Sequence, residues 1–190
     1  MPFFKSLPAD AGVAHVYRAH IDEYRPWIQM GDKVMTGDSP LTRAERELIA
    51  TFVSGLNGCD YCRASHVATM TALGLDAPLI DQLVADIDGA DVSDKLKPIL
   101  KYCRKLTLSP AQLSPEDAEA VFAAGWDETA LHSAIAVTCR FNFMNRLVMG
   151  HGLAAPDAEK ASRLAKARVK HGYARMLDKQ GDATPSPSAD

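Results

Sequence analysis

A short segment near residue 60 combines residue types that can carry out thiol chemistry. Cys59 and Cys62 are separated by two residues, and His66 follows four residues after the second cysteine. At about 100° of rotation per helical residue, the three side chains fall within roughly 60° of arc and share one face of a helix. A histidine one turn beyond a thiol can accept the thiol proton or donate one to a leaving oxygen. The pattern predicts a redox-active cysteine pair with its own acid–base group.

The position of the pair along the chain favours reactive cysteines. The turn signal Asn57-Gly58 comes directly before them, and residues 63–73 have the composition of a helix. At a helix N-terminus, unpaired backbone N–H groups and the positive end of the helix dipole favour a thiolate over a thiol. Asp60 is expected to face solvent, where its charge slightly opposes thiolate formation. Because the thiolate is the nucleophilic form, we expect this turn to activate the pair.

A carboxylate that orients His66 is expected from the helix before the turn, which offers Glu45 and Glu47. If that helix ends near Asn57 and the next one runs back antiparallel, a residue about 10 positions before the turn lies level with one about 8 after it. This register pairs Glu47 with His66. Glu45 has a simpler role as the reciprocal partner of Thr42 in a capping box.

Helical periodicity runs through the rest of the chain. Apolar residues recur at three- and four-residue steps in residues 41–56, 79–87 and 96–103, and no segment shows the alternation of a strand. Capping signals support helices that begin near Thr42, Ser114 and Asp127. The sequence therefore predicts an all-α fold, a bundle of about seven or eight helices.

The length of 190 residues fits a single domain, predicted here for residues 1–176. Residues 157–176 alternate charged residues with Ala and Leu. They predict a largely solvated helix that packs on a neighbouring helix or on a partner subunit. Residues 177–190 are rich in Gly, Pro, Ser and Asp and predict a disordered tail.

Composition excludes several classes of partner. Hydrophobic residues make up 47% and charged residues 24% of the chain, and the net charge of −3 gives no reason to expect nucleic acid or an anionic membrane surface. The most apolar candidate span, residues 130–149, contains His132, Arg140 and Arg146, which are costly in lipid. The first residues do not resemble a signal peptide, and four cysteines without a framework pattern favour reduced thiols. We expect a cytoplasmic protein.

From Glu47 to His66 the sequence resembles the core of the alkyl hydroperoxidase D-like, carboxymuconolactone decarboxylase superfamily. In that family a glutamate, two cysteines and a histidine stand at these same spacings. The resemblance implies an all-helical fold and a homo-oligomer, a dimer, trimer or hexamer. It also implies that Cys62 is the peroxidatic thiol, that Cys59 is the resolving thiol, and that Glu47 and His66 form a proton relay.

Two further features refine this resemblance. Residues 141–147, Phe-Asn-Phe-Met-Asn-Arg-Leu, look like the later helix of the subgroup called peroxidase-related enzymes. The second residue between the cysteines is histidine in the well-known peroxidases of the family and is Tyr61 here. We expect Tyr61 to help shape the thiol pocket or to supply a phenolic hydrogen bond to a substrate. The true decarboxylases of the superfamily lack the cysteine pair, so its presence here favours redox chemistry.

The function implied by the resemblance is thiol-dependent reduction of an alkyl hydroperoxide. The resulting disulfide would be reduced by a thioredoxin-like or lipoyl-bearing protein. No Gly-rich nucleotide fingerprint is present, so no cofactor is expected. Two alternatives remain open: a disulfide reductase or redox-switch protein without peroxide turnover, and a cofactorless enzyme that acts on a lactone with Glu47 and His66 as acid and base.

Other cysteines and histidines have simpler interpretations. A zinc site built on the cysteine pair and its histidine would need a ligand such as Cys103, Cys139 or His132, none of which has paired ligand spacing, and no metal site is predicted. Cys103 and Cys139 lie among apolar residues and are expected in the core. His132 and Arg146 belong to a helix over residues 128–149, which packing could bring near the thiols.

Overall fold

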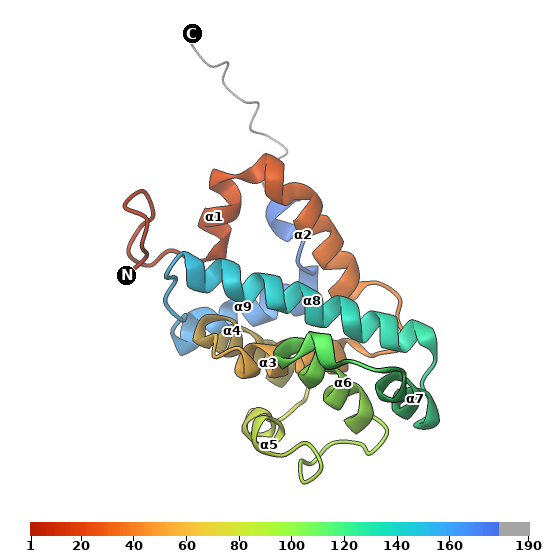
Figure 1. Cartoon of the computed structure of the whole chain (residues 1–190). Helices are drawn as coiled ribbons and strands as arrows, with labels where there is room; N and C mark the ends of the chain where they lie inside the picture. The colour runs from red at the N-terminus through yellow and green to blue at the C-terminus, as the bar shows by residue number, and fades with distance from the viewer. Residues whose placement is uncertain (179–190) are drawn as a thin grey trace.

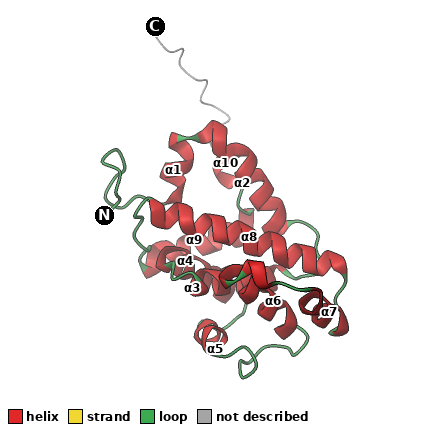
Figure 2. Ribbon diagram, in the orientation of Figure 1, coloured by secondary structure: helices red, strands yellow, loops and turns green. Residues whose placement is uncertain are grey.

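In the computed structural model, residues 1–178 are described, and every regular element within them is a helix (Figure 2). This confirms the predicted all-α class. The helices are α1 (Val13–Ala19), α2 (Ile21–Thr36), α3 (Arg43–Leu56), α4 (Asp60–Ala72), α5 (Leu79–Ala85), α6 (Lys97–Leu108), the 3₁₀ turn η1 (Pro110–Gln112), α7 (Pro115–Ala123), α8 (Glu128–Gly150), α9 (Ala158–His171) and α10 (Arg175–Asp178).

Seven of the α-helices in this range have nine residues or more, in line with the expected seven or eight. The other three, α1, α5 and α10, have seven, seven and four residues. Helix α5 falls within residues 79–87, where the sequence shows helical periodicity, whereas α1 and α10 are too short to produce a periodic pattern of their own.

The longest helix, α8, runs across the molecule between two groups of helices (Figure 1). Helices α3, α4, α6 and α7 pack on one side of it, and α2 packs on the other. Its buried residues include Val137, Phe141 and Val148, which lie along the faces that meet these neighbours. Neither α8 nor any other helix in residues 1–178 combines the length and apolarity that crossing a bilayer requires.

A tight hairpin between α3 and α4 sets the position of the thiol segment. The capping box that starts α3 forms as predicted, with Thr42 N–H donating to Glu45 Oε2 at 2.7 Å and Glu45 N–H donating to Thr42 Oγ1 at 3.2 Å. The helix ends at Leu56, with Asn57 as its C-cap, and Gly58 follows with a φ of 64°, in the left-handed region that favours glycine. The Cys59 N–H then donates to the Ser54 carbonyl at 2.9 Å, so Cys59 becomes the N-cap of α4.

The last long helix, α9, packs against α4, as expected for a helix with a thin apolar stripe. Ala161 and Ala165 form the buried side of α9. The Arg43 guanidinium, at the start of α3, donates to the carbonyls of Arg168 and Val169 at 3.1 and 3.2 Å, which ties the end of α9 to α3. The chain then continues through α10 to Asp178, and residues 179–190 of the predicted tail lie outside the described residues.

The two isolated cysteines differ in their environments. Cys103 is fully buried on α6, as predicted. Cys139 is exposed, so the prediction that it packs in the core is wrong. It lies on the outward stripe of α8 with His132, Phe143 and Arg146, at spacings that return to the same face of a helix. The apolar residues beside Cys139 in the sequence belong to the other faces.

Candidate active site

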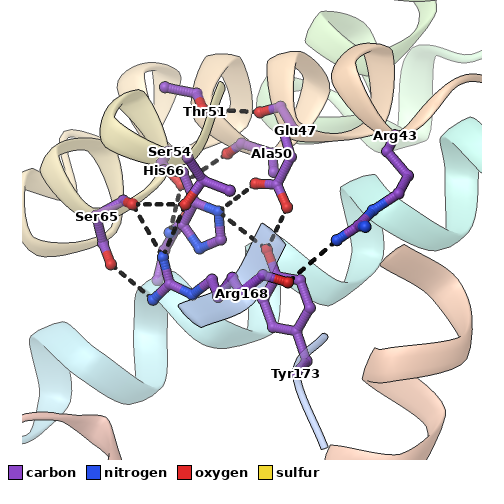
Figure 3. Close-up of polar contacts among 11 residues, drawn as sticks. Arg43, Glu47, Ala50, Thr51, Ser54, Ser65, His66, Arg168 and Tyr173 are labelled. Carbon is purple, nitrogen blue, oxygen red and sulfur yellow. Dashed lines mark hydrogen bonds and ion pairs between the residues drawn. The ribbon is translucent and has the colours of Figure 1, made fainter. Parts of the chain in front are cut away.

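Glu47 and His66 meet in the interior between α3 and α4 (Figure 3). Glu47 Oε2 lies 2.8 Å from His66 Nδ1, and the two residues are only 2% and 6% exposed. The antiparallel register expected across the Asn57-Gly58 turn thus brings these two side chains level. The structure places Cys59 and Cys62 at the start of the same helix as His66.

Tyr173, which the sequence analysis did not identify, completes this cluster from the far end of the chain (Figure 3). Its hydroxyl donates to Glu47 Oε1 at 2.5 Å and lies 3.4 Å from His66 Nδ1. Its ring is nearly parallel to the imidazole, with centroids 6.1 Å apart. Both oxygens of the Glu47 carboxylate are therefore hydrogen-bonded. No sequence pattern relates residue 173 to residue 47, because the two are joined only by the packing of α9 on α4.

The charges in this cluster follow from burial and from nearby donors. Burial opposes ionisation of Glu47, but His66, the hydroxyl of Tyr173 and the Arg168 guanidinium together hold the pKa of this carboxyl below its usual range. Burial, and then the positive charge of Arg168, lower the pKa of His66 despite the opposing effect of Glu47. At neutral pH the glutamate is a carboxylate and the histidine is neutral.

The tautomer of His66 follows from this charge state. A carboxylate can only accept hydrogen bonds, so Nδ1 of His66 carries the proton that faces Glu47. Nε2 then has a free lone pair and can act as a base. The imidazole edge also contacts the ring of Phe141 at a centroid distance of 4.6 Å, which restricts its rotation.

Arg168 holds α9 and α4 together beside the imidazole (Figure 3). Its Nη1 donates to the Ser65 carbonyl at 2.9 Å and to Thr69 Oγ1 at 3.1 Å, and its Nη2 donates to Ser65 Oγ at 2.7 Å. These neutral acceptors leave its positive charge uncompensated. The charge can therefore favour a carboxylate at Glu47 and disfavour an imidazolium at His66.

The two cysteines form a coupled pair of free thiols, 1% and 4% exposed. A hydrogen bond from the Cys62 thiol is the main cause that lowers the pKa of Cys59 to about 7, with help from the Cys62 backbone N–H and from Asn145. The same contact, together with burial, strongly raises the pKa of Cys62. The pair thus loses one proton near neutral pH and retains the other, and the two sulfurs share one negative charge.

Asn145 of α8 is a second site residue that the sequence analysis did not single out. It is fully buried, and its amide lowers the pKa of both cysteines. Two bonds hold its amide: Asn57 Nδ2 donates to Asn145 Oδ1 at 2.9 Å, and Asn145 Nδ2 donates to Ser54 Oγ at 3.0 Å. The only sequence signal for Asn145 is its place within residues 141–147, the segment that resembles the peroxidase-related enzymes.

A cavity of about 410 Å³ opens beside this cluster. Cys62 and His66 both line it, so a molecule in the cavity can reach a thiol and the imidazole together. Tyr61 lines it as well and accepts a hydrogen bond from the Val13 N–H at 3.0 Å. This bond anchors the start of α1 beside the cavity, and Tyr61 forms part of the cavity wall.

Other candidates from the sequence lie elsewhere. His132 and Arg146 are exposed on α8 and do not line the cavity, and Arg146 instead donates to the Asn142 carbonyl at 2.7 Å. Asp60 is exposed, as expected. Within residues 1–178, no three His, Cys, Asp or Glu side chains are close enough together to hold a metal ion.

Comparisons with known proteins agree with this fold. Residues 22–94 match the model of the carboxymuconolactone decarboxylase family. YdfG, an uncharacterized protein of Bacillus subtilis (strain 168), is 26% identical over 125 residues, which cover 66% of this chain and 85% of that protein. The crystal structure of a peroxidase-related protein from Silicibacter sp. TM1040 is similar, with a TM-score of 0.72, 28% identity and coverage of 80% of this chain and 79% of that one.

A second solved structure supports the same fold. It is an uncharacterized peroxidase-related protein from Ralstonia eutropha JMP134, described as an alkylhydroperoxidase AhpD core, with a TM-score of 0.71, 24% identity and coverage of 80% and 78% of the two chains. The fold and the site define an all-helical protein with a buried cysteine pair beside a Glu–His cluster. The match of residues 22–94 to the family model and the similar solved structures support the resemblance of this chain to the alkyl hydroperoxidase D-like, carboxymuconolactone decarboxylase superfamily.

The Tyr173→Phe substitution tests the bond that completes the cluster. Removing the hydroxyl leaves one oxygen of a buried carboxylate without a donor, and we expect a loss of about 1.5–3 kcal/mol in the free energy of unfolding. Urea unfolding at pH 7.5 measures this loss. Tyr102→Phe, which changes a partly buried tyrosine on α6, is the matched control. Equal stability of Tyr173→Phe and the wild type would contradict the described role of the hydroxyl.

The Asn145→Asp substitution tests the thiol pair. It replaces an amide donor by a carboxylate of nearly the same shape, so the shared negative charge on the sulfurs loses a donor and gains a repulsive neighbour. In the wild type, the rate of alkylation by iodoacetamide should rise with pH to a midpoint at about 7. In the variant, the midpoint should move up by at least about one pH unit. An unchanged midpoint would show that Asn145 does not stabilise the thiolate.

The low pKa of His66 predicts a pH-dependent stability. The unfolded chain binds a proton at a histidine near pH 6.5, whereas folded His66 resists protonation until lower pH. The unfolded state thus holds more protons below pH 6.5, and the free energy of unfolding should fall there by up to about 1.4 kcal/mol per pH unit. Urea unfolding between pH 7.5 and 5 should show a flatter profile for His66→Gln and the wild-type profile for His132→Gln, an exposed control.

Proposed function

We propose that this protein is a thiol peroxidase, a thiol-dependent reductase of organic hydroperoxides. The observation that carries the proposal is that one cavity is lined by both Cys62 and a neutral histidine whose Nδ1–H is held by Glu47. This arrangement offers a nucleophile and a proton carrier to the same bound molecule. The names of the two similar solved structures, both peroxidase-related proteins, support the same class of chemistry.

In the first step, the Cys62 thiolate attacks the distal oxygen of the hydroperoxide. The O–O bond breaks, an S–O bond forms, and the leaving alkoxide takes a proton to become an alcohol. His66 receives the thiol proton at Nε2 and returns it to the leaving oxygen, so that it is neutral before and after the step. Glu47 fixes the orientation and the tautomer of the imidazole, and the hydroxyl of Tyr173 holds Glu47 in place.

In the second step, the Cys59 thiol attacks the sulfenic acid on Cys62. An S–S bond forms and water leaves, which oxidises the pair to a disulfide. The adjacent position of the two sulfurs at the start of α4 favours this condensation. An external dithiol then reduces the disulfide by exchange and is itself oxidised, so that the pair returns to two thiols. A thioredoxin-like or lipoyl-bearing protein has the chemistry that this last step needs.

The assignment of roles within the pair rests on access as well as on acidity. Cys62 lines the cavity, so it is the sulfur that a bound hydroperoxide meets. Cys59 has the lower pKa, whereas Cys62 keeps its proton at neutral pH. His66 is the base that removes this proton, which places a negative charge on the sulfur that faces the substrate.

The test is the consumption of cumene hydroperoxide with dithiothreitol as reductant. We expect turnover by the wild type, none by Cys62→Ser, a single oxidation event without turnover by Cys59→Ser, and a rate lower by about 10²–10⁴-fold for His66→Gln. Cys139→Ser, which changes an exposed cysteine, is the matched control and should keep the wild-type rate.

Two other outcomes correspond to the alternative functions. If the wild type consumes no hydroperoxide but its cysteine pair oxidises and re-reduces, the protein is a disulfide reductase or a redox switch. If instead it converts a lactone and Cys62→Ser retains that activity, Glu47 and His66 are the acid and base of a cofactorless enzyme. Either result would refute the thiol peroxidase assignment.

A further inference from the structure

Arg140 of α8 is a buried guanidinium whose hydrogen-bonding capacity is mostly unused. The residue is 5% exposed and lines the cavity that holds Cys62. Its one hydrogen bond within the described residues runs from Nη1 to the Trp27 carbonyl, at the long distance of 3.5 Å, and Nε is buried without a partner there. Among the side chains that the structure describes, no carboxylate forms an ion pair with it. A buried, unpaired charge is costly and indicates an absent partner.

The surroundings hold this guanidinium in one place. Gly31 of α2 faces it, and a Cβ on that residue would lie 1.7 Å from Arg140 Nη1, so a larger residue there would displace the guanidinium. The guanidinium carbon lies 5.5 Å from the ring centroid of Trp27 and 5.6 Å from that of Tyr173. These aromatic contacts offset part of the cost of burying the cation. Arg140 is therefore a positioned group at the cavity wall.

Apart from Arg140, the cavity is lined mainly by apolar side chains and by positively charged ones. Its apolar lining includes Ile28, Phe141, Met144, Val148 and Leu164. Its other lining cations are Arg18, Lys160, Arg168 and Arg175, and no described lining residue is acidic. This excess of positive charge contrasts with the net charge of −3 of the whole chain. A cavity of this kind favours a molecule with an apolar body and a negative group.

Among these cations, Arg140 is the one best placed to bind an anion deep in the cavity. The N–H groups of Arg168 are already occupied by Ser65 and Thr69. Arg140 offers a planar fork of donors that matches the two oxygens of a carboxylate. It lines the same cavity as Cys62 and His66, so a ligand held by Arg140 can extend to the reacting groups.

We propose that Arg140 binds the carboxylate of the substrate, so that the natural substrate is an apolar organic hydroperoxide that carries a carboxylate group. The identity of the reacting group rests on the proposed function, whereas the anion site itself does not. In this arrangement the apolar wall holds the body of the molecule, and the carboxylate on Arg140 fixes which end of it faces Cys62.

The binding test uses molecules that cannot react. The reduced protein is titrated by calorimetry with 4-isopropylbenzoate and with 4-isopropylbenzamide, which has the same shape and no charge. We expect the benzoate to bind the wild type at least about 10-fold more tightly than the amide. Arg140→Gln should weaken benzoate binding by about 10- to 100-fold and leave amide binding unchanged. Arg163→Gln, an exposed arginine of α9 outside the cavity lining, should keep the wild-type preference.

The turnover test compares cumene hydroperoxide with its para-carboxylate derivative. We expect a higher kcat/KM for the carboxylate, and loss of that advantage in Arg140→Gln. Turnover of both compounds without a preference, together with equal binding of benzoate and amide, would overturn the anion site and leave the proposed function standing. A binding preference for benzoate without turnover of either hydroperoxide would support the anion site and refute the peroxidase.

A further variant covers the case in which Arg140→Gln does not fold. Arg140→Lys keeps the buried charge but offers a point charge in place of a planar fork. It should bind the benzoate about 10-fold more weakly than the wild type, with unchanged amide binding. Benzoate binding equal to that of the wild type in either variant would show that Arg140 is not the carboxylate site.

Discussion

The buried carboxylate of Glu47 is the constraint on which the arrangement of the site depends. A charge removed from water in the protein interior must be met by donors of good geometry, or it destabilises the fold. Here the donors come from two separate segments: the imidazole of His66 from α4, and the hydroxyl of Tyr173 from the chain after α9. The hairpin of α3 and α4 brings the imidazole of His66 to this carboxylate. The docking of α9 brings the hydroxyl of Tyr173 to it.

The positive charge of Arg168, which favours the Glu47 carboxylate, also favours the neutral form of His66. Arg168 favours ionisation of Glu47 and disfavours protonation of His66, so the pair is kept as carboxylate and neutral imidazole. A relay that rested as an imidazolium would have no lone pair to accept a thiol proton. The cations that line the cavity thus favour a neutral His66 beside the Glu47 carboxylate. The same cations would also favour the proposed anionic ligand.

The parts of the site that the sequence predicted are those that depend on local geometry. The cysteine pair, His66 and Glu47 lie on two consecutive helices joined by a short turn, so helical rise and one antiparallel register are enough to place them. Tyr173 and Arg140 reach the site through the packing of distant helices, which no spacing rule describes.

The all-α class followed from periodicity because that signal is repeated in every long helix. The prediction for Cys139 is wrong because the composition around one residue does not show which face of the helix it occupies. Apolar neighbours in sequence predict a core position, yet on a long helix that touches partners on only part of its circumference, the next residue can face water.

Tyr173, 107 residues after His66, has a further consequence for biosynthesis. A ribosome delivers both cysteines long before this tyrosine emerges, so a nascent chain carries its oxidisable thiols with an incomplete relay and an unclosed cavity. The Glu47–His66 cluster is therefore completed only when the segment after α9 has been synthesised.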